Sequence, residues 1–92
     1  MTNNNLSRFD LNERVFVITG GAGLLGVMHA EYIAAAGGTP VLSDLNGKSA
    51  EKAATSIFKK FGIPALGIKT DITDKANVEE LCSTVLNKFG RI

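Results

Sequence analysis

Cysteine and histidine are nearly absent from this chain of 92 residues, which holds one of each, Cys82 and His29. A single cysteine cannot close a disulfide within the chain, and neither residue stands at a spacing typical of metal ligands. His29 also lacks a partner in the sequence that would make it a catalytic base. We therefore expect no metal site and assign no catalytic role to either residue.

The chain also lacks a long apolar run. No window approaches the roughly 18 consecutive apolar residues of a membrane-spanning helix. The polar first residues do not contain the apolar segment of a signal peptide. We expect a cytoplasmic protein with no membrane partner, in which residues 1–13 form a polar tail and lead-in.

Charge of one sign is not in excess. Lys and Arg number 10, and Asp and Glu number 9, for a net charge of +1. The charges are interspersed, and Lys59 and Lys60 are the only adjacent basic pair. This pattern argues against a nucleic-acid partner. The length allows at most one small domain.

What the chain does contain is glycine at regular spacing, directly after the apolar run Val-Phe-Val-Ile at residues 15–18. Gly20 allows a tight turn out of the predicted strand. Gly23 lets the backbone approach phosphates, and Gly26 lets the following helix pack closely. The first turn of that helix carries unpaired N–H groups and the positive end of the helix dipole. The segment therefore predicts a binding site for the pyrophosphate of a dinucleotide.

An acid ends the second predicted strand. Asp44 lies about 18 residues after Gly26, close to the spacing expected for the acid that binds the adenosine ribose. Its carboxylate would accept hydrogen bonds from the ribose hydroxyls and repel a 2′-phosphate, and Leu45 offers that phosphate no cation. This favours NAD over NADP, although the nearby Lys48 leaves NADP open. The alternative is that Asp44 is only a turn or capping residue.

Strands and helices alternate along the rest of the chain. The pattern predicts strands at 14–19, 39–44 and 65–70, and helices at 24–36, from about 46 to 61, and up to about 89. Strands separated by helices must run parallel, with right-handed crossovers. We therefore predict an α/β fold of Rossmann type, with three strands in the spatial order 3-2-1 and three helices. Residues 14–92 would form this βαβαβα half of a doubly wound fold, an NAD-binding half-domain.

Each helix should pack on the sheet through an apolar face. In the first helix this face is expected to hold Leu25, Met28, Tyr32 and Ala36, with Ala30, Ile33 and Ala34 widening it. In the last helix the apolar stripe includes Cys82, which we expect to be a small core residue. Asn46 is the expected N-cap of the second helix.

Together these features resemble the N-terminal part of a short-chain dehydrogenase/reductase. The similarity is carried by Thr-Gly-Gly-Ala-Gly-Leu-Leu-Gly at 19–26, Asp44, Asp71-Ile72-Thr73, and Lys-Phe-Gly-Arg-Ile at 88–92. The resemblance implies that Asp71 accepts a hydrogen bond from the adenine amino group and that Ile72 meets the ring through its backbone. It also implies that Ala22 and Leu25 approach the cofactor through backbone atoms. The alternative is that Asp71 is only a turn residue at a strand end.

The activity that the resemblance implies is hydride transfer between a nicotinamide cofactor and an alcohol or ketone. Catalysis in this family uses a later Ser and a Tyr-x-x-x-Lys pair. The only tyrosine, Tyr32, is followed four residues later by Ala36. We therefore assign no catalytic residues and expect this chain alone to be inactive. It would supply the dinucleotide site of a longer homo-oligomeric enzyme that acts on a small molecule.

Two other assignments stay open. Compact members of the family usually have glycine at the position of Leu24. The pattern T-G-x-x-G-x-x-G found here is typical of the extended branch, which contains nucleotide-sugar epimerases and dehydratases. The segments at 71–73 and 88–92 resemble the compact branch, which we favour. The third hypothesis is a nucleotide-binding module without catalysis.

Overall fold

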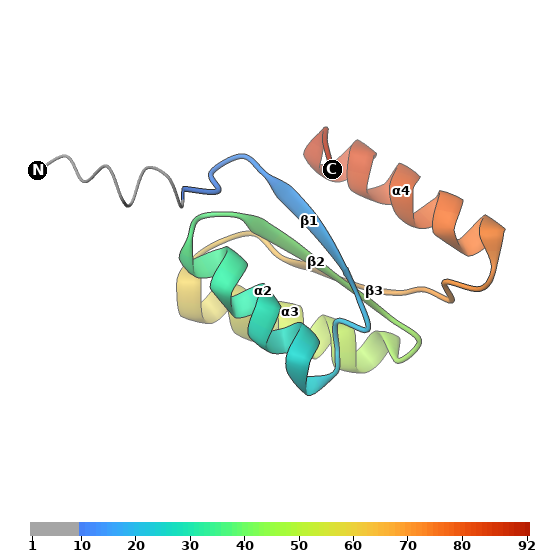
Figure 1. Cartoon of the computed structure of the whole chain (residues 1–92), viewed down its shortest axis with the longest axis horizontal. Coiled ribbons are helices and arrows are strands. Elements are labelled where there is room, and N and C mark those ends of the chain that lie inside the picture. The colour runs from blue at the N-terminus through green and yellow to red at the C-terminus, as the bar shows by residue number, and fades with distance from the viewer. Residues whose placement is uncertain (1–9) are drawn as a thin grey trace, which may run out of the picture.

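The chain folds into a three-stranded sheet with helices on both faces, as the computed structural model shows (Figure 1). The structure describes residues 10–92, so residues 1–9 of the predicted tail lie outside the described residues. The elements are β1 (Val15–Thr19), α2 (Leu24–Ala35), β2 (Thr39–Asp44), α3 (Gly47–Phe61), β3 (Leu66–Lys69) and α4 (Lys75–Phe89). The predicted alternation of strands and helices is confirmed.

The three strands run parallel in the spatial order β1-β2-β3. Val15 lies opposite Thr39 across the first pair of strands, and Asp44 lies opposite Lys69 across the second. The predicted Rossmann-type α/β fold with strand order 3-2-1 is therefore confirmed. Because parallel strands end at the same edge of a sheet, the turns that follow β1, β2 and β3 lie close together.

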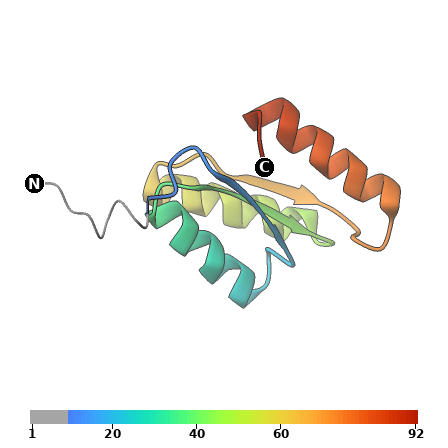
Figure 2. The same cartoon turned by 45° about the horizontal axis from the view of Figure 1, so that its top comes forward.

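The helices divide between the two faces of the sheet, with α2 and α3 on one side and α4 on the other (Figures 1 and 2). Leu42 packs with Ala30 and Ile57 under α2 and α3. Its neighbour Val41 packs with Val85 under α4. Successive strand residues point to opposite faces, so the central strand β2 contributes to both cores.

The buried face of α2 differs in part from the predicted one. Gly26, Ala30 and Ala34 are buried at a spacing of four residues. The larger side chains expected there are exposed instead: Leu25 by 63%, Met28 by 45% and Tyr32 by 75%. The prediction was correct for Ala30 and Ala34 and wrong for the three larger residues, which were placed on the face because of their hydrophobicity. A helix that lies close to a sheet needs small side chains on its contact face, and the glycine and alanine row supplies them.

The prediction that Cys82 belongs to the core is also wrong. Cys82 is exposed, and so is Leu86, whereas Leu81 and Val85 of the same helix are buried. Within residues 10–92 the sheet is the layer that packs on α4 (Figure 2). Side chains on the flank of the apolar stripe therefore have no neighbour that covers them.

Two helices begin with side-chain caps. Asn46 Oδ1 accepts the N–H of Ser49 at 3.0 Å, so the predicted N-cap of α3 is confirmed. Asp74 Oδ1 accepts the N–H of Ala76 at 2.9 Å at the start of α4. These bonds satisfy N–H groups that the first turn of a helix leaves without an intrahelical partner.

Candidate functional site

The turn between β1 and α2 has the geometry that its glycines predict. Gly20 has a φ of 65°, in the left-handed region that favours glycine. A Cβ at Gly26 would lie 2.5 Å from the carbonyl oxygen of Gly20, so α2 can begin this close to the turn only with glycine there. At Gly23 the φ is −75°. A Cβ there would meet only that same oxygen, at 3.4 Å. The fold itself therefore does not require glycine at position 23.

The N-terminus of α2 has no side-chain cap. Gly23 is its N-cap residue and offers no side-chain acceptor, unlike Asn46 of α3 and Asp74 of α4. The N–H groups of the first turn, which begins at Leu24, have no intrahelical partner. An uncapped helix N-terminus of this kind can bind an anion, because its N–H groups and its dipole both favour negative charge.

Asp44 lies beside this turn at the end of β2 and is partly buried. Its Oδ2 atom accepts the N–H of Ala22 at 3.1 Å, and its Oδ1 atom accepts the N–H of Asn46 at 2.9 Å. The residue before it, Ser43, accepts the N–H of Gly21 through its backbone carbonyl at 3.0 Å. The end of β2 is thus joined directly to the glycine turn, and the Ala22 N–H is already paired.

Asp71 follows β3 and forms a local turn. Its Oδ1 atom accepts the Thr73 N–H at 2.9 Å and the Thr73 hydroxyl at 2.6 Å. These bonds, the one from the hydroxyl above all, lower the pKa of the Asp71 carboxyl below its ordinary value of 3.8. Ile72 is 59% exposed. The Oδ1 atom of Asp71 is thus occupied by the turn, while Ile72 presents an apolar surface to solvent.

The three strand ends meet at one edge of the sheet (Figure 1). Ala22 and Asp44 are in direct contact there. The N–H of Thr70 donates to the carbonyl of Asp44 at 2.8 Å, which connects the end of β3 to the end of β2. The structure does not bring Asp71 or Ile72 into hydrogen-bond contact with the glycine turn within residues 10–92. Among the predicted site residues, the glycine turn and Asp44 are therefore connected, whereas Asp71 and Ile72 follow β3, the strand that pairs with β2.

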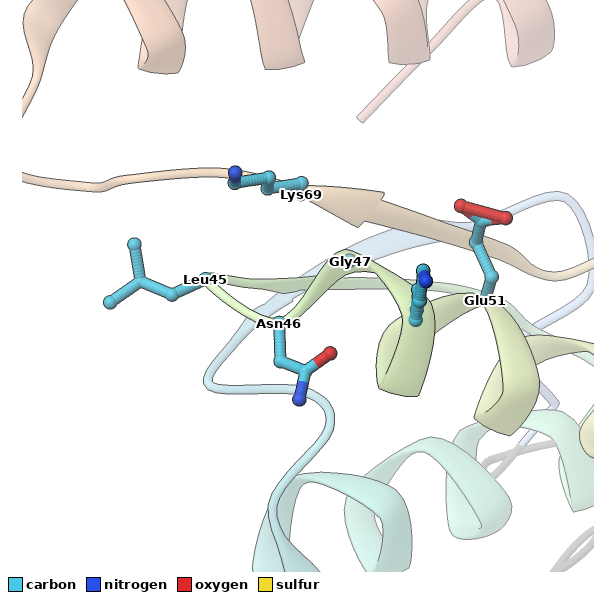
Figure 3. Close-up of a pocket in the computed structure, with 6 residues that line it drawn as sticks. Leu45, Asn46, Gly47, Glu51 and Lys69 are labelled. Carbon is cyan, nitrogen blue, oxygen red and sulfur yellow. The ribbon is translucent and has the colours of Figure 1, made fainter.

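A hollow of about 660 Å³ adjoins Asp44 on the α3 side (Figure 3). It is lined by Leu45, Asn46, Gly47, Lys48, Glu51 and Lys69. In Figure 3 the Lys69 side chain extends over the turn that starts α3, and Glu51 lies farther along that helix. Lys69 was not predicted as a site residue, since its only signal was its place near the end of the third predicted strand.

Gly21 has a role in the turn that was not predicted from the sequence. A Cβ at Gly21 would lie 2.6 Å from the Cβ of Leu42, so the turn crosses directly over β2. Spacing did not reveal this contact, because Gly21 lies outside the interval of three shared by the other glycines. The contact explains how the turn comes close enough to β2 for Asp44 to reach Ala22.

Two further findings concern residues 10–92 only. This part of the chain has no helix that combines the length and the apolar character needed to cross a bilayer. Within the same range, His, Cys, Asp and Glu side chains do not gather in groups of three that could hold a metal ion.

The parallel sheet, the glycine turn and the acid at the end of β2 together define a nucleotide-binding fold of Rossmann type. The family model described as short chain dehydrogenase matches residues 14–92. The chain belongs to the short-chain dehydrogenase family.

Similar proteins are oxidoreductases by name. Human 3-hydroxyacyl-CoA dehydrogenase type-2 is 36% identical over 78 residues, which cover 85% of this chain and 28% of that protein. The structure of NADPH-dependent 3-quinuclidinone reductase from Rhodotorula rubra has a TM-score of 0.90 at 29% identity, covering 100% of this chain and 35% of the reductase. NAD⁺-bound xylitol dehydrogenase has a TM-score of 0.83 at 32% identity, covering 89% and 31%. The chain thus spans about a third of the length of its relatives.

Proposed function

We propose that this chain provides the dinucleotide-binding part of an NAD(P)-dependent oxidoreductase that transfers a hydride between nicotinamide and an alcohol or ketone. The observation that carries the proposal is the uncapped N-terminus of α2 beside the carboxylate of Asp44. The helix N-terminus suits a pyrophosphate, and the carboxylate suits ribose hydroxyls. A dinucleotide presents both groups together. When bound, the cofactor supplies the hydride chemistry, and the residues of this chain position it.

Each predicted site residue has a place in this proposal. Gly20 and Gly26 shape the turn, and Gly23 leaves room in front of α2 for the phosphates. Ala22 and Leu25 approach the cofactor through their backbones. Asp44 accepts hydrogen bonds from the ribose hydroxyls. Asp71 accepts a hydrogen bond from the adenine amino group through its remaining oxygen, and Ile72 lies against the adenine ring. We assign no catalytic residue within this chain.

Asp44 makes NAD the preferred cofactor in this proposal. A carboxylate beside the ribose repels a 2′-phosphate, and Leu45 adds no positive charge. The relatives differ in this respect, because the quinuclidinone reductase is NADPH-dependent and the xylitol dehydrogenase structure holds NAD⁺. Lys48 and Lys69, which line the hollow next to Asp44, are the groups that would favour NADP.

The wider setting of the segment is also a proposal. Residues 14–92 form the NAD-binding half-domain, and residues 1–13 form its tail and lead-in, of which Leu11 donates its N–H to the carbonyl of Ala36 at 2.9 Å. The whole protein acts in the cytoplasm, as a homo-oligomer, on a small-molecule substrate, without nucleic acid or membrane partners. This segment alone is inactive.

An epimerase or dehydratase of the extended branch is the second candidate. The spacing of Gly20, Gly23 and Gly26 favours it. The names of the similar proteins, which are dehydrogenases and reductases, support the compact branch instead. A non-catalytic nucleotide-binding module is the third candidate and would bind the dinucleotide without turnover.

Calorimetric titration with NAD and with NADP tests the proposal. We expect NAD to bind at least about tenfold more tightly, the ratio that 1.4 kcal/mol produces. Equal affinities would contradict the preference for NAD. Absence of binding to either dinucleotide would contradict the proposed function itself.

A further inference from the structure

Asp44, the proposed ribose-binding residue, also contacts the glycine turn. Its two oxygens hold the N–H groups of Ala22, at 3.1 Å, and of Asn46, at 2.9 Å. We infer that Asp44 is a positioning residue for the turn, so that one carboxylate serves both the ribose and the pyrophosphate ends of the site. This inference rests on the proposed function, because it concerns the same dinucleotide.

The turn depends on few contacts. The N–H of Gly21 donates to the Ser43 carbonyl at 3.0 Å, and the N–H of Gly23 donates to the Gly20 carbonyl at 3.1 Å. Within the described part of the chain, Asp44 is the one residue whose side chain hydrogen-bonds to residues 20–23. Three of these four residues are glycines, which have little conformational preference of their own. Loss of a hydrogen bond to a charged group therefore loosens the turn more than it would loosen a helix or strand.

The carboxylate has the capacity for both tasks. An ionised carboxylate offers about four acceptor positions on its two oxygens. The bonds from Ala22 and Asn46 occupy one position on each oxygen. The remaining positions stay available for ribose hydroxyls, so the cofactor can bind without breaking the contact to the turn.

This arrangement has a consequence for cofactor selection. If Asp44 contacted only the ribose, its removal would weaken the binding of NAD and strengthen the binding of NADP, because the charge that repels the 2′-phosphate would be gone. If Asp44 also positions the turn, its removal weakens the binding of both dinucleotides, since both carry the pyrophosphate. The ratio of the two affinities then moves toward NADP while each affinity falls.

Hydrogen exchange in the ligand-free full chain tests the contact itself. In Asp44→Ala, we expect the Ala22 amide to exchange at least about tenfold faster. Glu51→Gln is the matched control, because Glu51 is a nearby exposed acid on α3 whose side chain does not contact the turn (Figure 3). Acceleration at Asn46 with an unchanged Ala22 would overturn the inference, since it would confine Asp44 to the start of α3.

Titration with inorganic pyrophosphate tests whether Asp44 supports binding at the pyrophosphate end of the site. Removing a negative charge beside an anion site should tighten pyrophosphate binding, and Glu51→Gln measures that effect of charge alone. We expect Asp44→Ala to weaken pyrophosphate binding several-fold despite the lost charge. Equal or tighter binding would overturn the inference.

Two measurements separate the possible failures. If Asp44→Ala does not fold, protection of the Ala22 amide from hydrogen exchange in the unmodified protein tests the inference. An Ala22 amide that is not protected overturns it. If the unmodified protein binds no NAD, the proposed function fails, whereas the exchange experiment still reports whether Asp44 holds the turn.

Discussion

The carbonyl oxygen of Gly20 lies where a side chain at Gly26 would begin, 2.5 Å from an ideal Cβ position. The turn that leaves β1 and the first turn of α2 are thus in backbone contact. Gly21 adds to this contact, since its Cα would lie 2.8 Å from the same Cβ. The start of α2 therefore packs against backbone atoms, which cannot move aside for an added methyl group as the end of a flexible side chain could.

Gly26→Ala should destabilise the fold. The added methyl group must push α2 away from the turn, and overpacking of this kind costs about 1–3 kcal/mol. Chemical denaturation of the variant and the unmodified chain measures the difference in free energy of unfolding. An unchanged midpoint would show that α2 can shift freely and that the close packing is not required.

Gly23→Ala should separate binding from folding. Its φ of −75° suits alanine. The nearest atom to the new Cβ would be at an ordinary distance of 3.4 Å. The thermal unfolding midpoint should therefore stay unchanged, while NAD affinity falls at least about tenfold because the methyl group stands before the phosphates. Unchanged NAD affinity in the folded variant would place the pyrophosphate elsewhere.

Gly67→Ala should weaken the packing of α3 on β3. A Cβ at Gly67 would overlap the backbone of Ala50 in α3, so the helix must move. We expect a loss of about 1–3 kcal/mol in the free energy of unfolding. Gly62→Ala is the control, because Gly62 has a φ of 69° but open space around it. That variant should lose only about 1 kcal/mol from backbone strain. A Gly67→Ala variant no less stable than the control would contradict the close contact.

Thr73→Val should raise the pKa of Asp71 toward 3.8, because the hydroxyl of Thr73 is the main cause of its lowered value. A lowered pKa in the folded state stabilises the fold above that ordinary value, and this contribution is lost as the pH falls through the lowered pKa. The variant should therefore lose less stability on acidification than the unmodified chain. NMR titration of the Asp71 carboxyl carbon measures the shift. Thr55→Val serves as the control, since its hydroxyl donates to the Glu51 carbonyl instead.

The order of the elements could be predicted from the sequence because each signal is local. An apolar run before glycine marks a buried strand, and the Asn46 cap opens α3 with a bond to a residue three positions on. The parallel arrangement followed from chain connectivity. The strand order followed from the doubly wound dinucleotide-binding fold that the glycine turn indicates. The position of Asp44 at the carboxyl end of β2 could also be predicted, because Asp44 follows the apolar residues of that strand.

The tertiary structure decided which surfaces meet. The contact face of α2 is the row of Gly26, Ala30 and Ala34 and not the larger apolar residues, because the distance between helix and sheet selects for size as well as hydrophobicity. Cys82 is exposed for a related reason: its helix touches the sheet along a narrow strip.

For the candidate site, the residues at the strand ends could be predicted from the amino-acid pattern: a glycine turn after β1, an acid at the end of β2 and an acid after β3. The sequence did not determine that Asp44 binds Ala22, which lies 22 residues away. That bond exists because Gly21 lets the turn cross directly over Leu42. A contact of this kind depends on the distance between two backbones, which is set only when the strands pair and the helix packs on them.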